Sequence, residues 1–294
     1  MKRLSFAFLI MMASSAISAQ DDLMNLLNEN AAPAVNYTTA TFKSTRIMNG
    51  HSIERMAPGQ LDFRISHRFG RLNSGAYEFF GLDQANIRLG LEYGILKWLM
   101  VGVGRGTYEK TFDGFAKFSL LRQSSGAKVM PVSVSLFSSV SLKTLKLSGV
   151  TESDYWSNRL SYVGQVLVAR KISPALSLQL TPSFVHRNPD NPAGEPADLW
   201  SIGAGGRVKL SKRISFNAEY YYVANPEDYL NQPVYNPLSV GFDVETGGHV
   251  FQLIFTNSVA MIEKGFIGET TGQWSKGDIH FGFNISRVFT LKKY

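Results

Sequence analysis

The sequence predicts an all-β protein, a transmembrane antiparallel β-barrel of about 12 strands. Three observations predict this fold. Apolar and polar residues alternate along many extended segments, and most segments approach the roughly 9 to 11 residues of a tilted spanning strand, not the roughly 5 to 6 of a soluble one. Short connections mostly alternate with long ones, as in outer-membrane barrels. The chain also begins with an export signal.

The first residues carry that signal. Lys2 and Arg3 precede an apolar run over residues 4–12, and the small residues of "SSAISAQDD" follow it. This is the pattern of a secretory signal peptide, here residues 1–19. A cut one residue earlier remains an alternative, and either cut predicts export.

The remaining composition excludes several classes of protein. No later apolar run approaches the roughly 18 residues of a spanning helix, and the mean hydropathy is -0.06. The formal net charge of +7 becomes +5 once Lys2 and Arg3 leave with the signal peptide (7 minus 2). This excess is interleaved with acids and predicts no nucleic-acid partner. The absence of cysteine excludes disulfides, thiolate metal sites and attachment of lipid through a cysteine.

The chain divides into a signal peptide at 1–19, a periplasmic leader or lumen segment at 20–59, and an outer-membrane barrel at 60–294. Residues 20–36 suit a short amphipathic helical turn that ends at Pro33. A Thr-rich extended piece follows at 37–48. Were it a spanning strand, the strand count would be odd, so we place it at the periplasmic mouth or inside the lumen; a fourteen-strand barrel is the alternative.

The expected strands follow from the alternation. They are 60–69, 83–93, 99–108, 112–121, 131–142, 159–171, 175–186, 199–210, 214–223, 239–246, 249–258 and 277–288.

The connections between these strands divide into two kinds. Short turns include Ser173 with Pro174 and Gly247 with Gly248, whereas the segment 259–276 is a long loop. Two connections depart from the alternation, because 109–111 is short where a loop is expected and 122–130 is long for a turn. The other long connections are 143–158, 187–198 and 224–238.

The alternation also predicts which face of each strand meets lipid. In the strand 214–223, Ile214, Tyr220 and Tyr222 share a face opposite Glu219, because successive strand side chains point to opposite sides. We expect lipid on the apolar face and a polar lumen on the other. The last strand, 277–288, would pair with the first and leave no sheet edge exposed.

Three stretches carry a family resemblance. They are "GQLDFRISHRFG" (Gly59 to Gly70), the preceding "TFKSTRIMNGHS" (Thr41 to Ser52) and the leader "DDLMNLLNE". Together they resemble an uncharacterised beta-barrel outer-membrane family of Bacteroidota, the domain of unknown function 5777. The resemblance is sharpest over residues 21–93. It implies an outer-membrane barrel and brings no assigned activity.

Charged residues of both signs fall on the expected lumen face. Two interpretations remain open: a salt-bridged lumen that rigidifies the barrel, and a charged filter that selects solutes. The candidate filter residues are Arg64, Arg68, Arg88, Glu219, Asp243 and Glu245.

Other motifs favour structural roles. "GVGRG" (Gly102 to Gly106) and "GAGGR" (Gly203 to Arg207) lack the lysine-serine ending of a phosphate loop, so we expect their glycines to reduce bulk on the lumen wall or to permit curvature. The five histidines form no pattern typical of a metal or catalytic site. We therefore predict no catalytic residue, no metal, no cofactor and no enzymatic activity.

These features predict a small channel for diffusion of polar or charged solutes in the cell outer membrane. The alternative is a plugged structural barrel that scaffolds partner proteins through its loops or its N-terminal leader. Expected partners are outer-membrane lipid and lipopolysaccharide, and the barrel-assembly machinery during biogenesis. No protein partner is identified.

Overall fold

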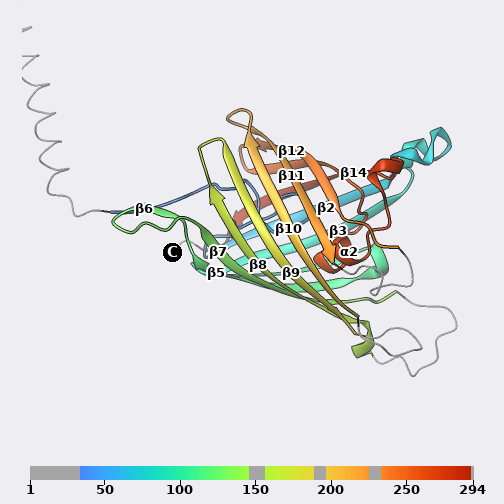
Figure 1. The fold of residues 1–294 in the computed structure, drawn as a ribbon, viewed down its shortest axis with the longest axis horizontal. Coiled ribbons are helices and arrows are strands. Elements are labelled where there is room, and N and C mark those ends of the chain that lie inside the picture. The colour runs from blue at the N-terminus through green and yellow to red at the C-terminus, as the bar shows by residue number, and fades with distance from the viewer. Residues whose placement is uncertain (1–33, 146–155, 189–196, 225–232, 293–294) are drawn as a thin grey trace, which may run out of the picture. The chain divides into compact units, whose positions relative to one another are not determined.

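The computed structural model describes residues 34–145, 156–188, 197–224 and 233–292. Within these ranges, twelve antiparallel strands form one closed barrel (Figure 1). Barrel strands that follow each other along the chain are paired. The last strand, β14 (His280–Thr290), pairs with the first, β2 (Gln60–Arg71), and closes the barrel. The predicted fold class and the predicted closure are confirmed.

The strands of the barrel coincide with the twelve predicted segments, and their ends differ from the predictions by up to three residues. Beyond β2 and β14 they are β3 (Ala85–Leu96), β4 (Leu99–Gly106), β5 (Phe112–Leu121), β7 (Ser133–Leu142), β8 (Leu160–Lys171), β9 (Leu176–Arg187), β10 (Ala197–Lys209), β11 (Ile214–Ala224), β12 (Leu238–Thr246) and β13 (His249–Thr256).

The two faces of the wall follow the predicted alternation. On β11, Ile214, Tyr220 and Tyr222 are exposed, whereas Ser215 and Glu219 are buried. An apolar outer face and a polar inner face are what a membrane barrel requires. The same alternation holds in the closing pair of strands, where Ile285 lies opposite Ile65 and Asn284 lies opposite Ser66.

The two ends of the barrel differ. The turns at 97–98, 172–175, 210–213 and 247–248 lie at one end, which we call the short-turn end, together with the start of β2 and the end of β14. At the other end the connection after β4 holds only the short 3-10 helix η3 (Tyr108–Lys110). β5 ends and β7 begins at the short-turn end. The long connection between these two strands contains β6 (Ser124–Gly126), which pairs with β1 (Val35–Tyr37) in a separate compact unit.

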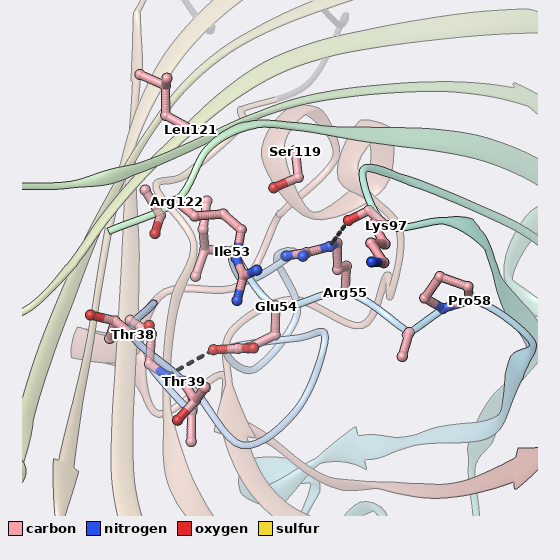
Figure 2. A pocket seen from close by; sticks show the side chains of 14 residues that line it. Thr38, Thr39, Ile53, Glu54, Arg55, Pro58, Lys97, Ser119, Leu121 and Arg122 are labelled. Atoms are coloured by element: carbon pink, nitrogen blue, oxygen red, sulfur yellow. Dashed lines mark hydrogen bonds between the residues drawn. The ribbon is translucent and has the colours of Figure 1, made fainter. Parts of the chain in front are cut away.

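Residues 38–59, which we call the plug, do not join the barrel wall. Residues 41–53 are almost completely buried and contact inward-facing side chains of many strands. The plug folds back through a bridge between Arg46 and His51, closed by a hydrogen bond from the Ile47 N–H to the Gly50 carbonyl (2.9 Å). Figure 2 shows the two end segments of the plug, labelled by Thr39 and Arg55, on the same side as Lys97 of the turn at 97–98. The fourteen-strand alternative is wrong, because this segment pairs with itself inside the lumen.

A second segment enters the barrel at the opposite end. Residues 257–279, which we call the inward loop, contain the short helix α2 (Glu263–Gly268), all of whose residues are buried. Phe266 and Ile267 pack against inward-facing apolar residues, among them Val185 on β9 and Tyr221 on β11. The sequence predicts only a long loop here, because α2 is too short to give a recognisable helical period.

Among the described residues, no helix is long and apolar enough to cross a membrane. The predicted signal peptide, the predicted leader up to residue 33 and parts of the connections at 143–158, 187–198 and 224–238 lie outside the described residues.

Candidate functional site

The tip of the plug is fixed to the wall by one carboxylate. Glu219 on β11 accepts hydrogen bonds from the backbone N–H groups of Met48 (3.3 Å), Asn49 (2.6 Å) and Gly50 (3.2 Å). Consecutive N–H groups turned toward one point form an anion-binding nest. The plug supplies this nest from its turn, and the wall supplies the anion.

The side chain of Asn49 and the carbonyl of Met48 extend this attachment to three other strands. Its Nδ2 donates to Ser239 Oγ (2.9 Å), and Arg68 Nη2 donates to its Oδ1 (2.6 Å). The neighbouring Met48 carbonyl accepts a bond from Asn284 Nδ2 (3.0 Å). The tip therefore contacts β2, β11, β12 and β14 through polar groups.

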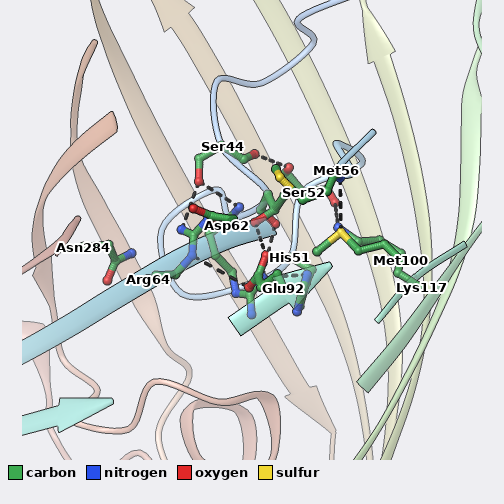
Figure 3. A network of polar contacts seen from close by, with 12 residues as sticks. Ser44, His51, Ser52, Met56, Asp62, Arg64, Glu92, Met100, Lys117 and Asn284 are labelled. Atoms are coloured by element: carbon green, nitrogen blue, oxygen red, sulfur yellow. Dashed lines mark hydrogen bonds and ion pairs between the residues drawn. The ribbon is translucent and has the colours of Figure 1, made fainter. Parts of the chain in front are cut away.

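A buried network of charges holds the base of the plug hairpin (Figure 3). Arg46 Nη1 lies 2.9 Å from Glu92 Oε1, and Thr45 Oγ1 donates to Glu92 Oε2 (2.6 Å). Arg64 Nη2 bonds both Thr45 Oγ1 (2.8 Å) and Asp62 Oδ2 (2.7 Å). Because every charge in this network has an opposite partner nearby, their burial is tolerated.

His51 is completely buried in the plug between two aromatic rings. Its ring centroid lies 4.6 Å from that of Phe115 and 4.2 Å from that of Phe137. Burial lowers the pKa of His51 well below its usual value, and the Arg46 charge lowers it further. Since Arg46 Nη1 lies 2.8 Å from His51 Nδ1, the neutral imidazole accepts a hydrogen bond from the guanidinium.

Other wall side chains bind carbonyl groups of the plug. Lys117 Nζ donates to the carbonyls of Ser52 (3.0 Å) and Glu54 (2.6 Å). Gln252 Nε2 donates to the Ile47 carbonyl (2.9 Å). These bonds satisfy backbone acceptors that no strand partner reaches.

The inward loop is tied to the connections after β4 and β7 by a separate group of charges. Lys264 Nζ lies 2.5 Å from Glu109 and 2.7 Å from Glu269, and Lys143 lies 2.7 Å from Glu109. Burial opposes ionisation of Glu109, but Lys264 and Lys143 outweigh it and lower its pKa. The plug and the inward loop also approach each other, since His51 Nε2 of the plug lies 3.8 Å from Glu263 in α2.

The six predicted filter residues all lie on the barrel wall, and each has a protein partner. Arg64, Arg68 and Glu219 bind the plug directly. Glu245 pairs with Lys43 of the plug (2.5 Å). They contact the plug instead of lining one open constriction.

The other two filter candidates bind partners on the wall. Asp243 accepts a bond from Gln252 (2.9 Å), which itself reaches the plug. Arg88 on β3 forms an ion pair with Asp113 on β5.

At least one glycine in each of the two Gly-rich motifs makes room inside the lumen, as the sequence predicts. A Cβ on Gly102 would lie 2.3 Å from the Phe115 ring, and one on Gly205 would lie 2.5 Å from Ile47 Cδ1. The wall is therefore shaped for the segment that fills it.

Sequence reasoning missed Arg46, Asn49 and His51 of the plug, and Lys264 of the inward loop. The Asn49-Gly50 pair is a turn signal that indicates a hairpin, but it does not indicate where the hairpin lies. Within the described ranges, no group of three or more His, Asp or Glu side chains is placed to hold a metal ion.

Comparisons with known proteins give one family and several solved structures. Residues 42–289 match the model of a family described as a membrane bound beta barrel domain. No curated protein matches the sequence.

The chain is similar in structure to a NanC porin (10% identity, 79% of this chain and 100% of that chain, TM-score 0.48). It is also similar to the KdgM porin (9% identity, 79% and 99%, TM-score 0.45). A third similar structure is an outer membrane channel from Pseudomonas putida F1 (10% identity, 80% and 97%, TM-score 0.41).

Proposed function

The chain belongs to the family of membrane bound beta barrel domains known as domain of unknown function 5777, and we propose that it is a gated channel for small polar or charged solutes. The plug closes the lumen in the conformation described here, and solutes pass when the plug leaves. This proposal develops the expected diffusion channel by adding the segment that controls it.

The chemistry of the inner wall carries the proposal. Four successive inward positions on β9 are Ser177, Gln179, Thr181 and Ser183, and all four are buried. A wall that packs permanently against its own plug is stable when it is apolar, whereas hydroxyl and amide groups suit a lumen that fills with water. Water can replace each hydrogen bond that these groups and their neighbours make.

The plug uses mostly bonds of this replaceable kind. Glu219, Arg68 and Asn284 hold its tip through hydrogen bonds. When the plug leaves, the charges of Glu219 and Arg68 face the lumen, where they act as part of the filter predicted from the sequence. The other four members, which complete that filter, are Arg64, Arg88, Asp243 and Glu245.

Location and partners follow from the same proposal. The signal peptide exports the chain, the barrel-assembly machinery inserts it, and outer-membrane lipid and lipopolysaccharide surround it. The short-turn end then faces the periplasm, as in outer-membrane barrels. We assign no enzymatic activity and no nucleic-acid partner.

One observation favours the second candidate, a permanently closed barrel that scaffolds partner proteins. Phe42, Ile47 and Ile53 of the plug form an apolar cluster with Phe115 and Phe137 of the wall. Burial of an apolar side chain contributes about 1.5 to 3 kcal/mol, so this cluster opposes release of the plug.

An engineered disulfide distinguishes the two candidates. The chain has no cysteine, and Asn49 Nδ2 lies 2.9 Å from Ser239 Oγ, so Asn49→Cys with Ser239→Cys places one thiol on the plug beside one on the wall. Single-channel current is recorded in a planar bilayer under oxidising conditions and then after addition of a reductant. The two single variants are the controls.

The gated channel predicts discrete current steps for the native chain, silence for the oxidised double variant, and steps again after reduction. Equal current from the oxidised and reduced double variant would show that solutes do not pass through the plugged lumen. Silence of the folded, inserted native chain would favour the scaffold.

A further inference from the structure

A cavity of about 320 Å³ lies between the plug and the wall at the short-turn end (Figure 2). Residues 38–41, 53–55, 57 and 58 of the plug form one side. Lys97, Ser119 and Arg122 from the wall strands and their connections form the other side. The volume is at the lower end of the roughly 300 to 1,000 Å³ of small-molecule sites, which suits a compact ligand.

Three cations and one acid line this cavity. The cations are Arg55, Lys97 and Arg122, and the acid is Glu54. The Glu54 carboxylate already accepts hydrogen bonds from the backbone N–H groups of Thr41 (2.7 Å) and Phe42 (3.2 Å). The cavity therefore has an excess of positive charge.

Arg55 is held in position within the cavity. Its Nε donates to the Lys97 carbonyl (2.6 Å), which uses one of the five N–H donors of the guanidinium. In Figure 2 the side chains of Arg55 and Arg122 extend toward each other. Burial lowers the pKa of Arg55, and the Arg122 charge lowers it further while Glu54 raises it, so an added anion would relieve a repulsion between two like charges.

Hydroxyl groups accompany these cations. Thr38, Thr39 and Ser119 line the cavity, and Figure 2 shows all three around the two arginines. Guanidinium groups match the oxygens of a phosphate in geometry and charge, and hydroxyls donate to the remaining oxygens.

We propose that this cavity binds a phosphate group, with Arg55 and Arg122 on its oxygens and Lys97 at the rim. The phosphate belongs either to a free small phosphate compound or to a phospholipid headgroup. The second source is sterically accessible, since the exposed apolar Leu121 lies at the same edge of the barrel as the cavity.

A phosphate in this position contacts the plug and the wall together. It would bind more tightly to the closed barrel than to the open one and would favour closure by the difference in affinity. This regulatory consequence rests on the proposed function, whereas binding itself does not.

Binding is tested on the full, folded chain in neutral detergent by isothermal titration with inorganic phosphate at low salt. The variants are Arg55→Gln and Arg122→Gln. The matched control is Arg213→Gln, which removes the same charge from an exposed position in a turn at the same end of the barrel. A second arm adds phosphatidylglycerol to the phosphate-free neutral detergent micelles and compares the melting temperature with and without this lipid for the native chain and for each variant.

Saturable phosphate binding that falls at least tenfold in both variants, and is unchanged in Arg213→Gln, would support a free phosphate ligand. A rise in melting temperature with phosphatidylglycerol that both variants lose would support a lipid headgroup. Absence of both effects, or equal effects in the variants and the native chain, would overturn the site. Because neither arm measures current, failure here leaves the test of the gated channel unaffected.

Discussion

The Asn49 backbone N–H donates a 2.6 Å hydrogen bond to the carboxylate of Glu219, joining the tip of the plug to the inner wall of β11. Both residues are almost fully buried. Met48 and Gly50 direct their N–H groups at the same carboxylate. The attachment concentrates on one side chain, so a change at that side chain tests the role of the plug.

Replacement of Glu219 by glutamine is expected to loosen the plug. The amide keeps the size of the side chain but presents only one acceptor oxygen and no charge to the three N–H groups. Hydrogen bonds to a charged group contribute about 1.5 to 3 kcal/mol, and each 1.4 kcal/mol is about tenfold in an equilibrium. We expect the open fraction in single-channel records to rise at least tenfold. Glu78→Gln, in the connection after β2, is the control, and an unchanged open fraction in Glu219→Gln would exclude this anchor from gating.

Arg46 of the plug and Glu92 of β3 are expected to be energetically coupled. Removal of one partner of a buried ion pair costs about 3 to 5 kcal/mol, because a charge is left buried without compensation. We therefore expect Arg46→Gln and Glu92→Gln each to lower the urea midpoint of unfolding. The double variant should be less destabilised than the sum of the two single variants. Additive losses would show that Thr45 and Arg64, not Arg46, compensate Glu92.

The barrel could be predicted from the sequence because each strand carries its own evidence. On β11 the alternation of Ile214, Ser215 and Phe216 depends on lipid outside and a polar interior, which are the same for every strand. The predicted range of β5, 112–121, even coincides with the observed strand. β14 begins three residues later than predicted, because Asp278 accepts the Gln273 N–H and closes a turn there.

The plug could not be predicted in the same way. Arg46, Asn49 and His51 are polar, and a polar segment without periodicity is ordinarily assigned to a solvated loop. Each of them is buried because of a partner far away in the sequence, as with Asn49 and Glu219, which are 170 positions apart. Such pairings depend on the closed barrel and leave no local pattern. The partners of the six predicted charges on the wall could not be predicted for the same reason.

Gly50 is expected to tolerate no side chain. A Cβ at this position would lie 2.1 Å from the Tyr221 hydroxyl oxygen and 3.3 Å from Glu219 Oε2. Tyr221 is itself buried against Phe266 of the inward loop, so it has little room to move. We expect Gly50→Ala to displace the plug tip and to increase hydrogen exchange of the plug amides at least tenfold. Gly248→Ala, where an added Cβ meets nothing within 4 Å, is the control, and equal exchange in both variants would contradict the steric argument.

Acid is expected to release the inward loop through Glu109. Its pKa is lowered in the folded protein because Lys264 and Lys143 outweigh the effect of burial, so the folded state binds its proton less tightly than the unfolded state. The stabilisation is therefore complete above the unfolded pKa of about 4.3 and is lost as the pH falls through the lower folded value. Hydrogen exchange of α2, corrected for intrinsic rates, should accelerate at least tenfold below that range. In Glu109→Gln the α2 amides should already exchange faster at pH 7 and respond less to acid, because Lys264 then keeps only Glu269 as a partner. If native and Glu109→Gln proteins show the same acid response, another carboxylate controls the loop, and Glu269, 2.7 Å from Lys264, is the next to replace.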